Sequence, residues 1–114
     1  MVVRQSFAGM EGCSLCGVFD GHGLDGAAIA SWVRDDIATR FEDALLAELK
    51  WLAELDIDAE GSSLKDAVTN AYLKAFSQVE KKTHSLPQLD TSCSGTTVVT
   101  AFKKVRLRHC LPSR

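Results

Sequence analysis

An aspartate and a histidine stand close together in the glycine-rich segment Asp20-Gly21-His22-Gly23, directly after an apolar run. A carboxylate at the end of a strand, beside backbone that glycine leaves accessible, suits a hard divalent cation, which takes oxygen ligands from side chains, carbonyls and water. An adjacent histidine can move protons near neutral pH. The same residues also suit a simpler role, in which the aspartate caps its own turn and the histidine fills space. From the residue types alone, both interpretations stay open.

The chain has four cysteines, of which Cys13 and Cys16 have the spacing of half a zinc site. Cys93 and Cys110 do not supply a second close pair. If the first pair lies in a strand, residues three apart point to opposite faces, which is the wrong geometry for one metal ion. We therefore interpret the cysteines as small buried apolar side chains with reduced thiols, in preference to zinc ligands.

The element that must position the aspartate is a buried strand, predicted from the apolar run Leu15-Cys16-Gly17-Val18-Phe19 that ends at the glycine-rich turn. Six of the eight glycines lie between Gly9 and Gly26, which indicates a backbone that turns sharply or approaches another segment closely. A second strand is predicted at residues 95–102, where β-branched residues dominate. A third, at residues 105–108, would pair with it across a turn at Lys103-Lys104.

Two helices are predicted between these strands. In residues 25–55 apolar side chains recur every three or four positions, with Asp25 as the N-cap. The stripe consists of Ile29, Val33, Ile37, Phe41, Leu45, Leu49 and Leu52. The second helix covers residues 64–82, begins with Ser63 and Asp66 in the pattern of a capping box, and ends before Pro87. The predicted fold class is α+β, with two helices on a sheet of few strands.

Length and composition limit the remaining possibilities. The chain has 114 residues, 46% hydrophobic and 25% charged, which is typical of one globular domain. No apolar run approaches the roughly 20 residues that cross a bilayer, and no secretory leader is evident, so we expect no membrane partner and an intracellular, cytoplasmic or nuclear, location. Residues 103–114 carry five basic and no acidic side chains, but without interleaved aromatic residues we predict no nucleic-acid binding.

Two segments of the sequence are similar to the protein phosphatase 2C family of metal-dependent protein serine/threonine phosphatases. Cys16-Gly-Val-Phe-Asp-Gly-His-Gly23 resembles the family's signature, and Asp90-Thr-Ser-Cys-Ser-Gly-Thr-Thr-Val-Val-Thr-Ala101 resembles its serine-glycine-threonine-threonine strand. The two motifs occur in the family's order, with two predicted helices between them. The resemblance covers about residues 13–102.

The resemblance implies hydrolysis of phosphoserine and phosphothreonine in protein substrates by a water that two Mn²⁺ or Mg²⁺ ions activate. It implies that Asp20 bridges both ions, that Gly21 offers its backbone carbonyl to one of them, and that His22 is the general acid. It also implies that a set of four residues braces the sheet beside the site: Ser94, Gly95, Thr96 and Thr97. The family places its phosphate-binding arginine upstream of the first motif, and we do not give that role to Arg4.

The chain departs from the family's pattern after the second motif. The family continues into a Gly-Asp-Ser-Arg strand and later supplies two more metal-binding aspartates, and this sequence contains neither. Two divalent ions bring four positive charges, of which the Asp20 carboxylate neutralises one. A complete site for two ions is therefore not encoded in these 114 residues.

The resulting hypothesis is a truncated phosphatase 2C-like catalytic domain in residues 1–102, followed by a divergent basic segment in residues 103–114. Its architecture would be a partial β-sandwich, part of the family's four-layer α-β-β-α arrangement. We expect the chain alone to be inactive, and a non-catalytic interaction module is the alternative. We also expect self-association, through an exposed helix face or a strand edge.

Overall fold

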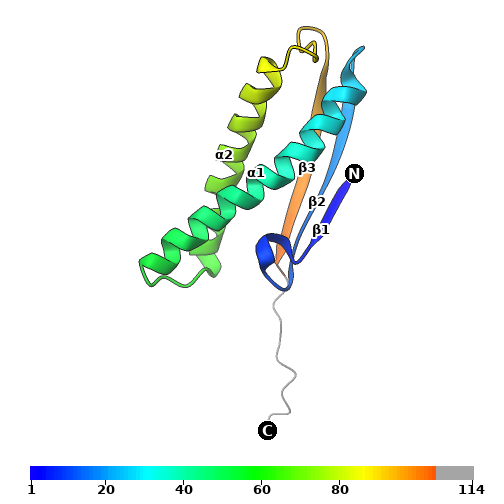
Figure 1. Cartoon of the computed structure of the whole chain (residues 1–114). Coiled ribbons are helices and arrows are strands. Elements are labelled where there is room, and N and C mark those ends of the chain that lie inside the picture. The colour runs from blue at the N-terminus through cyan, green and yellow to red at the C-terminus, as the bar shows by residue number, and fades with distance from the viewer. Residues whose placement is uncertain (105–114) are drawn as a thin grey trace.

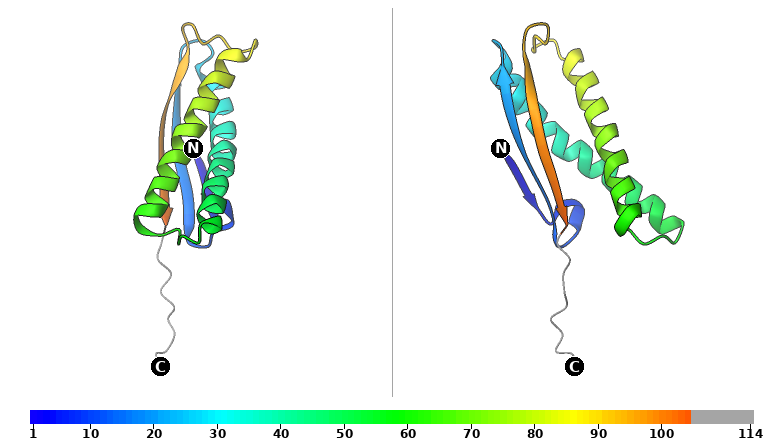
Figure 2. Two further views of the ribbon diagram at one scale, coloured as in Figure 1. Left: turned by 90° about the vertical axis from the view of Figure 1, so that its left-hand side faces the viewer. Right: turned by 180° about the vertical axis from the view of Figure 1, so that it is seen from behind.

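A computed structural model describes residues 1–104, in which two long helices pack on one antiparallel sheet (Figure 1). In chain order the elements are β1 (Val2–Gln5), the 3-10 turn η1 (Phe7–Gly9), β2 (Cys13–His22), α1 (Gly26–Glu54), α2 (Gly61–Ser85) and β3 (Gly95–Lys104). The strand order is β1-β2-β3, and both helices lie on the same side of the sheet (Figure 2). The predicted α+β class with two helices packed on a sheet is confirmed.

The sequence-based prediction differs from the structure mainly in the strands. The strand β1 was not predicted, because its four residues are too few to show a period-2 pattern. The predicted turn at Lys103-Lys104 is wrong, since both lysines belong to β3 and pair with β2. The predicted strand at 105–108, the rest of the basic segment and Cys110 lie outside the described residues.

The sheet has one buried face and one exposed face, because side chains alternate along each strand. In β2 the side chains of Cys13 and Leu15 are buried beneath the helices, whereas Cys16 and Val18 are exposed on the opposite side. The register of β2 against β3 sets Leu15 opposite Phe102, so the two strands share this alternation. The helices therefore cover only one face of the sheet.

An aromatic cluster joins the helices to the sheet. The ring of Phe41 in α1 stacks on Tyr72 in α2 and on Phe7 in η1, with centroid separations of 4.1 and 5.2 Å. Phe102 of β3 meets Phe41 edge-on at 5.9 Å. Offset-stacked and edge-to-face contacts of this kind add to the free energy gained from burying the rings. Phe41 thus contacts aromatic rings from three other elements.

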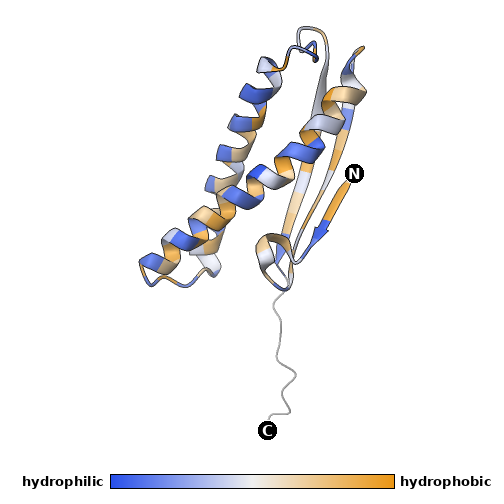
Figure 3. Cartoon of the chain, viewed as in Figure 1, coloured by the Kyte–Doolittle hydropathy of each residue, from blue (hydrophilic) through white to orange (hydrophobic). Residues whose placement is uncertain are grey.

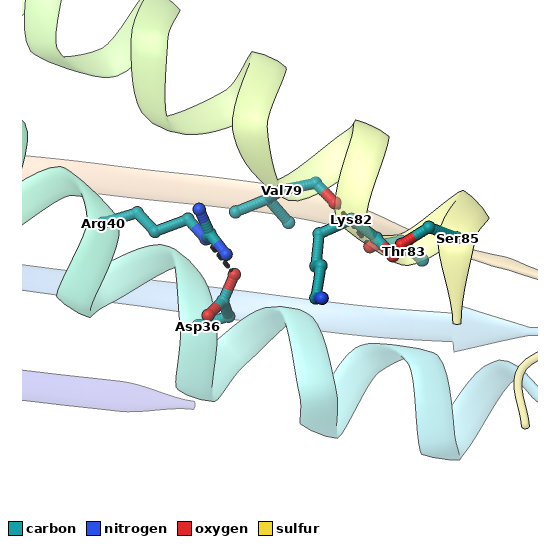
Figure 4. A network of polar contacts seen from close by, with 6 residues as sticks. All are labelled: Asp36, Arg40, Val79, Lys82, Thr83 and Ser85. Carbon is teal, nitrogen blue, oxygen red and sulfur yellow. Dashed lines mark hydrogen bonds and ion pairs between the residues drawn. The ribbon is translucent and has the colours of Figure 1, made fainter. Parts of the chain in front are cut away.

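The two helices are fixed by local polar contacts as well as by the core. The capping box of α2 uses Glu60 as N-cap and Ser63 three residues later, so the predicted box of Ser63 and Asp66 is shifted by three positions. Near the end of α2 the buried hydroxyl of Thr83 donates to the Val79 carbonyl at 2.7 Å, and on α1 Arg40 pairs with Asp36 (Figure 4). Each of these contacts lies within one helix or at its start, where it satisfies local polar groups.

The predicted apolar stripe of α1 is largely covered. Its first five members, from Ile29 to Leu45, are buried, and only Leu49 and Leu52 are half-buried. Three valines are exposed on the open face of the sheet, where Val3, Val18 and Val99 are 56%, 57% and 71% exposed. Within residues 1–104 no helix is both long enough and apolar enough to cross a membrane.

We expect Phe41→Ala to lower the free energy of unfolding by about 3–5 kcal/mol, because it removes a fully buried ring and leaves a cavity between three elements. Leu73→Ala, in the exposed middle of α2, is the control and should change stability by no more than about 0.5 kcal/mol. Urea denaturation followed by circular dichroism measures both, and similar losses in the two variants would contradict the assigned core.

Candidate functional site

The two motifs singled out in the sequence lie side by side on neighbouring antiparallel strands. Asp20 is opposite Thr97, Gly21 opposite Thr96, and His22 opposite Gly95. The segments that the chain separates by about seventy residues therefore form one end of the sheet, next to the start of α1 (Figure 1). This juxtaposition makes that end of the sheet the candidate site.

Gly21 and Gly26 let the end of β2 and the first turn of α1 touch backbone to backbone. A Cβ at position 21 would overlap the Gly26 carbonyl, and a Cβ at position 26 would lie 2.8 Å from the Gly21 carbonyl carbon. Neither glycine has a positive φ, so the requirement is space and not backbone conformation. The structure thus gives a reason for glycine at position 21 that is independent of a metal ion near its carbonyl.

Gly23 and Gly95 similarly allow the two motifs to approach each other closely. Gly23 has φ +86°, and a Cβ there would lie 2.5 Å from the Cys93 carbonyl oxygen. A Cβ at Gly95 would lie 3.1 Å from Nε2 of His22, so the imidazole occupies the space that a side chain at 95 would need. The glycine of the second motif therefore makes room for the histidine of the first.

Hydrogen bonds join the start of α1 to the loop before β3. The backbone N–H of Asp25 donates to Oγ of Ser94 at 3.1 Å, and the Asp90 N–H donates to Oδ2 of Asp25 at 2.8 Å. Asp25 is the N-cap residue of α1, as predicted, but its side chain makes no capping bond and accepts from Asp90 instead. The sequence did not reveal this role, because nothing local to Asp25 distinguishes a distant acceptor from a cap.

Asp90 is itself held by its neighbours. Oδ1 of Asp90 accepts from the Ser92 hydroxyl at 2.5 Å and from the Ser92 N–H at 2.9 Å. The Ser92 hydroxyl is the main cause, and its N–H the next, of a pKa for the Asp90 carboxyl below the usual value. A lowered pKa favours the folded loop above the unfolded carboxyl's pKa of about 3.9, and that contribution is lost as pH falls through the folded value.

Asp20 and His22 lie on the open face of the sheet, away from the helices. Both side chains are exposed, and they share this face with Val18 and Val99. The Thr97 hydroxyl donates to the Asp20 carbonyl at 3.3 Å, which ties the second motif to the backbone of the first. As far as residues 1–104 define it, the site therefore lies at the edge of an open surface and not in an enclosed cavity.

Arg4 lies on the other side of the sheet. Arg4 belongs to β1 and is paired with Leu15 of β2, whose side chain is buried beneath the helices. Because Asp20 stands five residues after Leu15 in the same strand, the side chains of Arg4 and Asp20 point to opposite faces. Arg4 and Asp20 therefore lie on different sides of the sheet.

The described residues do not fit a two-metal centre. In residues 1–104 no group of three or more histidine, cysteine, aspartate or glutamate side chains is placed to hold a metal ion. Asp20 would supply one carboxylate, whereas magnesium and calcium sites use several oxygen ligands. This part of the chain thus offers one donor side chain and leaves any further ligands to be supplied from elsewhere.

The geometry also argues against zinc at Cys13 and Cys16. Cys13 is buried on the helix side and Cys16 is exposed on the open face, as expected for residues three apart in a strand. Burial raises the pKa of the Cys13 thiol, which disfavours the thiolate that a metal requires. Cys93, before β3, is exposed, so the expectation of buried cysteines holds for Cys13 and is wrong for Cys16 and Cys93.

Several curated plant proteins are similar to the chain. It is 35% identical over 103 residues to probable protein phosphatase 2C 64 of Oryza sativa subsp. japonica, covering 90% of this chain and 22% of that protein. It is 37% identical over 101 residues to probable protein phosphatase 2C 41 of Arabidopsis thaliana, covering 88% of this chain and 28% of that protein. The chain spans between 22% and 30% of the length of such relatives. No family model matches the chain.

We expect Gly21→Ala to destabilise the chain more than Gly9→Ala, by about 1–3 kcal/mol, because the new methyl group must displace the first turn of α1. Gly9 is the control because it has φ +70° and no atom lies within 4 Å of an added Cβ. The Gly9→Ala variant therefore measures only the cost of placing alanine in a left-handed backbone conformation. Thermal unfolding compares the two variants. Equal losses would show that the contact between Gly21 and Gly26 is not a packing constraint.

We expect Ser92→Ala to raise the pKa of the Asp90 carboxyl toward its usual value, because the variant removes the hydroxyl that donates to it. NMR titration of the side-chain carboxyl measures the shift directly. Ser77→Ala, on the exposed side of α2, is the matched control and should leave the titration midpoint of the Asp90 carboxyl unchanged. An Asp90 midpoint that does not move in Ser92→Ala would contradict the assigned cause.

Proposed function

Because the chain belongs to the protein phosphatase 2C family, we propose that it forms part of a metal-dependent protein serine/threonine phosphatase. The substrates in this proposal are proteins that carry phosphoserine or phosphothreonine, and the ions are Mn²⁺ or Mg²⁺. The observation that supports it best is the register that sets the two family-like motifs opposite each other, with Asp20 against Thr97 and His22 against Gly95.

In this proposal Asp20 is a metal-binding carboxylate, Gly21 contributes its carbonyl, and His22 gives a proton to the leaving hydroxyl. Asp20 and His22 are two residues apart in one strand, so they project from the same face and reach the same solvent-exposed region. Ser94, Gly95, Thr96 and Thr97 support the site. Their contacts are the bonds to Asp25 and Asp20 and the space left for the imidazole.

We infer that the chain alone does not turn over substrate. Residues 1–104 bring one aspartate side chain, that of Asp20, to the open face of the sheet at the site, and no group of three or more possible metal-ligating side chains is present in that range. On the open face the apolar side chains of Val18 and Val99 are left exposed by residues 1–104. Both features are as expected if additional protein completes the site on that side of the sheet, as in relatives more than three times as long.

A non-catalytic interaction module is the second candidate. It is favoured by the same shortage of metal ligands in the described part of the chain. Binding of a partner that survives Asp20→Asn, without any hydrolysis in the assay below, would support this candidate.

The test measures phosphate release from a phosphothreonine peptide in excess Mn²⁺, by the chain alone and by a chimaera. In the chimaera, residues 13–102 replace the matching segment of the rice relative. We expect background release from the chain and Mn²⁺-dependent release from the chimaera. Asp20→Asn should reduce the chimaera's rate by at least about a hundredfold, since loss of a metal-binding carboxylate removes transition-state charge stabilisation.

The matched control is Asp35→Asn, which removes one exposed carboxylate from α1 and should leave the chimaera's rate unchanged. A folded chimaera that releases no phosphate would contradict the catalytic proposal. Release by the chain alone that Asp20→Asn abolishes would contradict the inference that the chain lacks a complete site.

A further inference from the structure

A groove with both apolar and polar lining residues lies at the end of the helical hairpin farthest from Asp20. It is formed by the last turns of α1, the connecting loop and the first turns of α2, and has a volume of about 400 Å³. Its apolar lining includes Trp51, Leu52 and Ile57. Trp51 is 58% exposed and Ile57 44% exposed, which is unusual for side chains of this size. Figure 3 shows hydrophobic and hydrophilic positions side by side at this end of the hairpin.

The groove is bordered by acidic side chains. Glu48 lines it from α1 and Asp66 from α2, and no basic residue lines it. Between positions 48 and 66 the sequence carries six acidic and two basic side chains. Across residues 1–104, neither Glu48 nor Asp66 forms an ion pair with another side chain. The groove thus combines exposed apolar area with uncompensated negative charge.

We propose that this groove binds a partner protein through a segment rich in arginine and leucine. A guanidinium group can stack on the indole of Trp51 and pair with Glu48 and Asp66. The hydrocarbon stem of the arginine and a neighbouring leucine would cover Leu52 and Ile57. An acidic segment, a nucleic acid or an anionic membrane would be repelled, and a purely apolar segment would desolvate both carboxylates without pairing them.

The groove and the Asp20 motif lie at opposite ends of α1 (Figure 1). Glu48 stands twenty-two residues after the first residue of α1, and an α-helix rises about 1.5 Å per residue, so the groove and the site are about 30 Å apart. A partner bound in the groove would therefore leave the open face of the sheet free. The inference does not rest on the proposed phosphatase function, and its test measures binding alone.

The test titrates the full chain into a short fluorescein-labelled peptide of arginine and leucine and follows fluorescence anisotropy. We expect binding that weakens as salt rises, and no binding of the same peptide with glutamate in place of arginine. Glu48→Gln with Asp66→Asn should weaken binding about tenfold, as should Trp51→Ala, because these side chains supply the charge pairs and the stacking surface.

The matched control for the double variant is Asp35→Asn with Glu80→Gln. It removes one exposed carboxylate from each helix, outside the groove, so the net charge changes equally. We expect this control to bind the peptide as the unaltered chain does. Circular dichroism checks that every variant keeps its helical content.

Three outcomes would overturn the proposal. Equal weakening in the control and groove variants would mean that overall acidity attracts the peptide. Equal binding of the glutamate peptide would remove the charge argument. Sedimentation that shows a dimer, dispersed by Trp51→Ala, would identify a second copy of the chain as the occupant.

Discussion

The contact between Gly21 and Gly26 is the constraint on which the arrangement of this protein depends. At this point the end of β2 and the first turn of α1 touch backbone to backbone, with no room for a side chain on either. That contact fixes where α1 leaves the sheet, and therefore which face of the sheet the helices cover. It also leaves Asp20 and His22 on the other face, where they are exposed. One steric requirement thus links the packing of α1 on the sheet to the end of β2 that carries the candidate catalytic residues.

The helices were predictable from the sequence because their signal is long and local. The stripe from Ile29 to Leu52 repeats over seven positions, and the structure follows it almost to the residue. The strand β1 was not predictable, since four residues cannot establish a period, and its place in the sheet depends on pairing with Gly17 to Ser14. The capping box was displaced for a related reason, because Glu60 is an uncommon N-cap and Ser63 alone suggested a later start.

The candidate site, like the fold, was predictable from the sequence only in part. Asp20, Gly21 and His22 could be singled out by residue type and motif, but their partners could not. Asp25 and Asp90 are sixty-five residues apart, and only the fold brings the amide of one to the carboxylate of the other. The open face with Val18 was likewise hidden in the sequence, because a half-exposed strand and a fully buried one both read as an apolar run. The sequence identifies the candidate catalytic and metal-binding residues, and the tertiary structure identifies the residues that position them.

The difference in length between the helices and the sheet has a dynamic consequence. At about 1.5 Å per residue the 29 residues of α1 extend roughly 43 Å, whereas the ten residues of β2, at about 3.4 Å each, cover roughly 34 Å. The buried positions of α1 end at Leu45, so its last turns are supported mainly by α2. Amide protons there should exchange with solvent faster than those beside the sheet. The hairpin end can thus open locally while the junction of β2 and α1 stays closed.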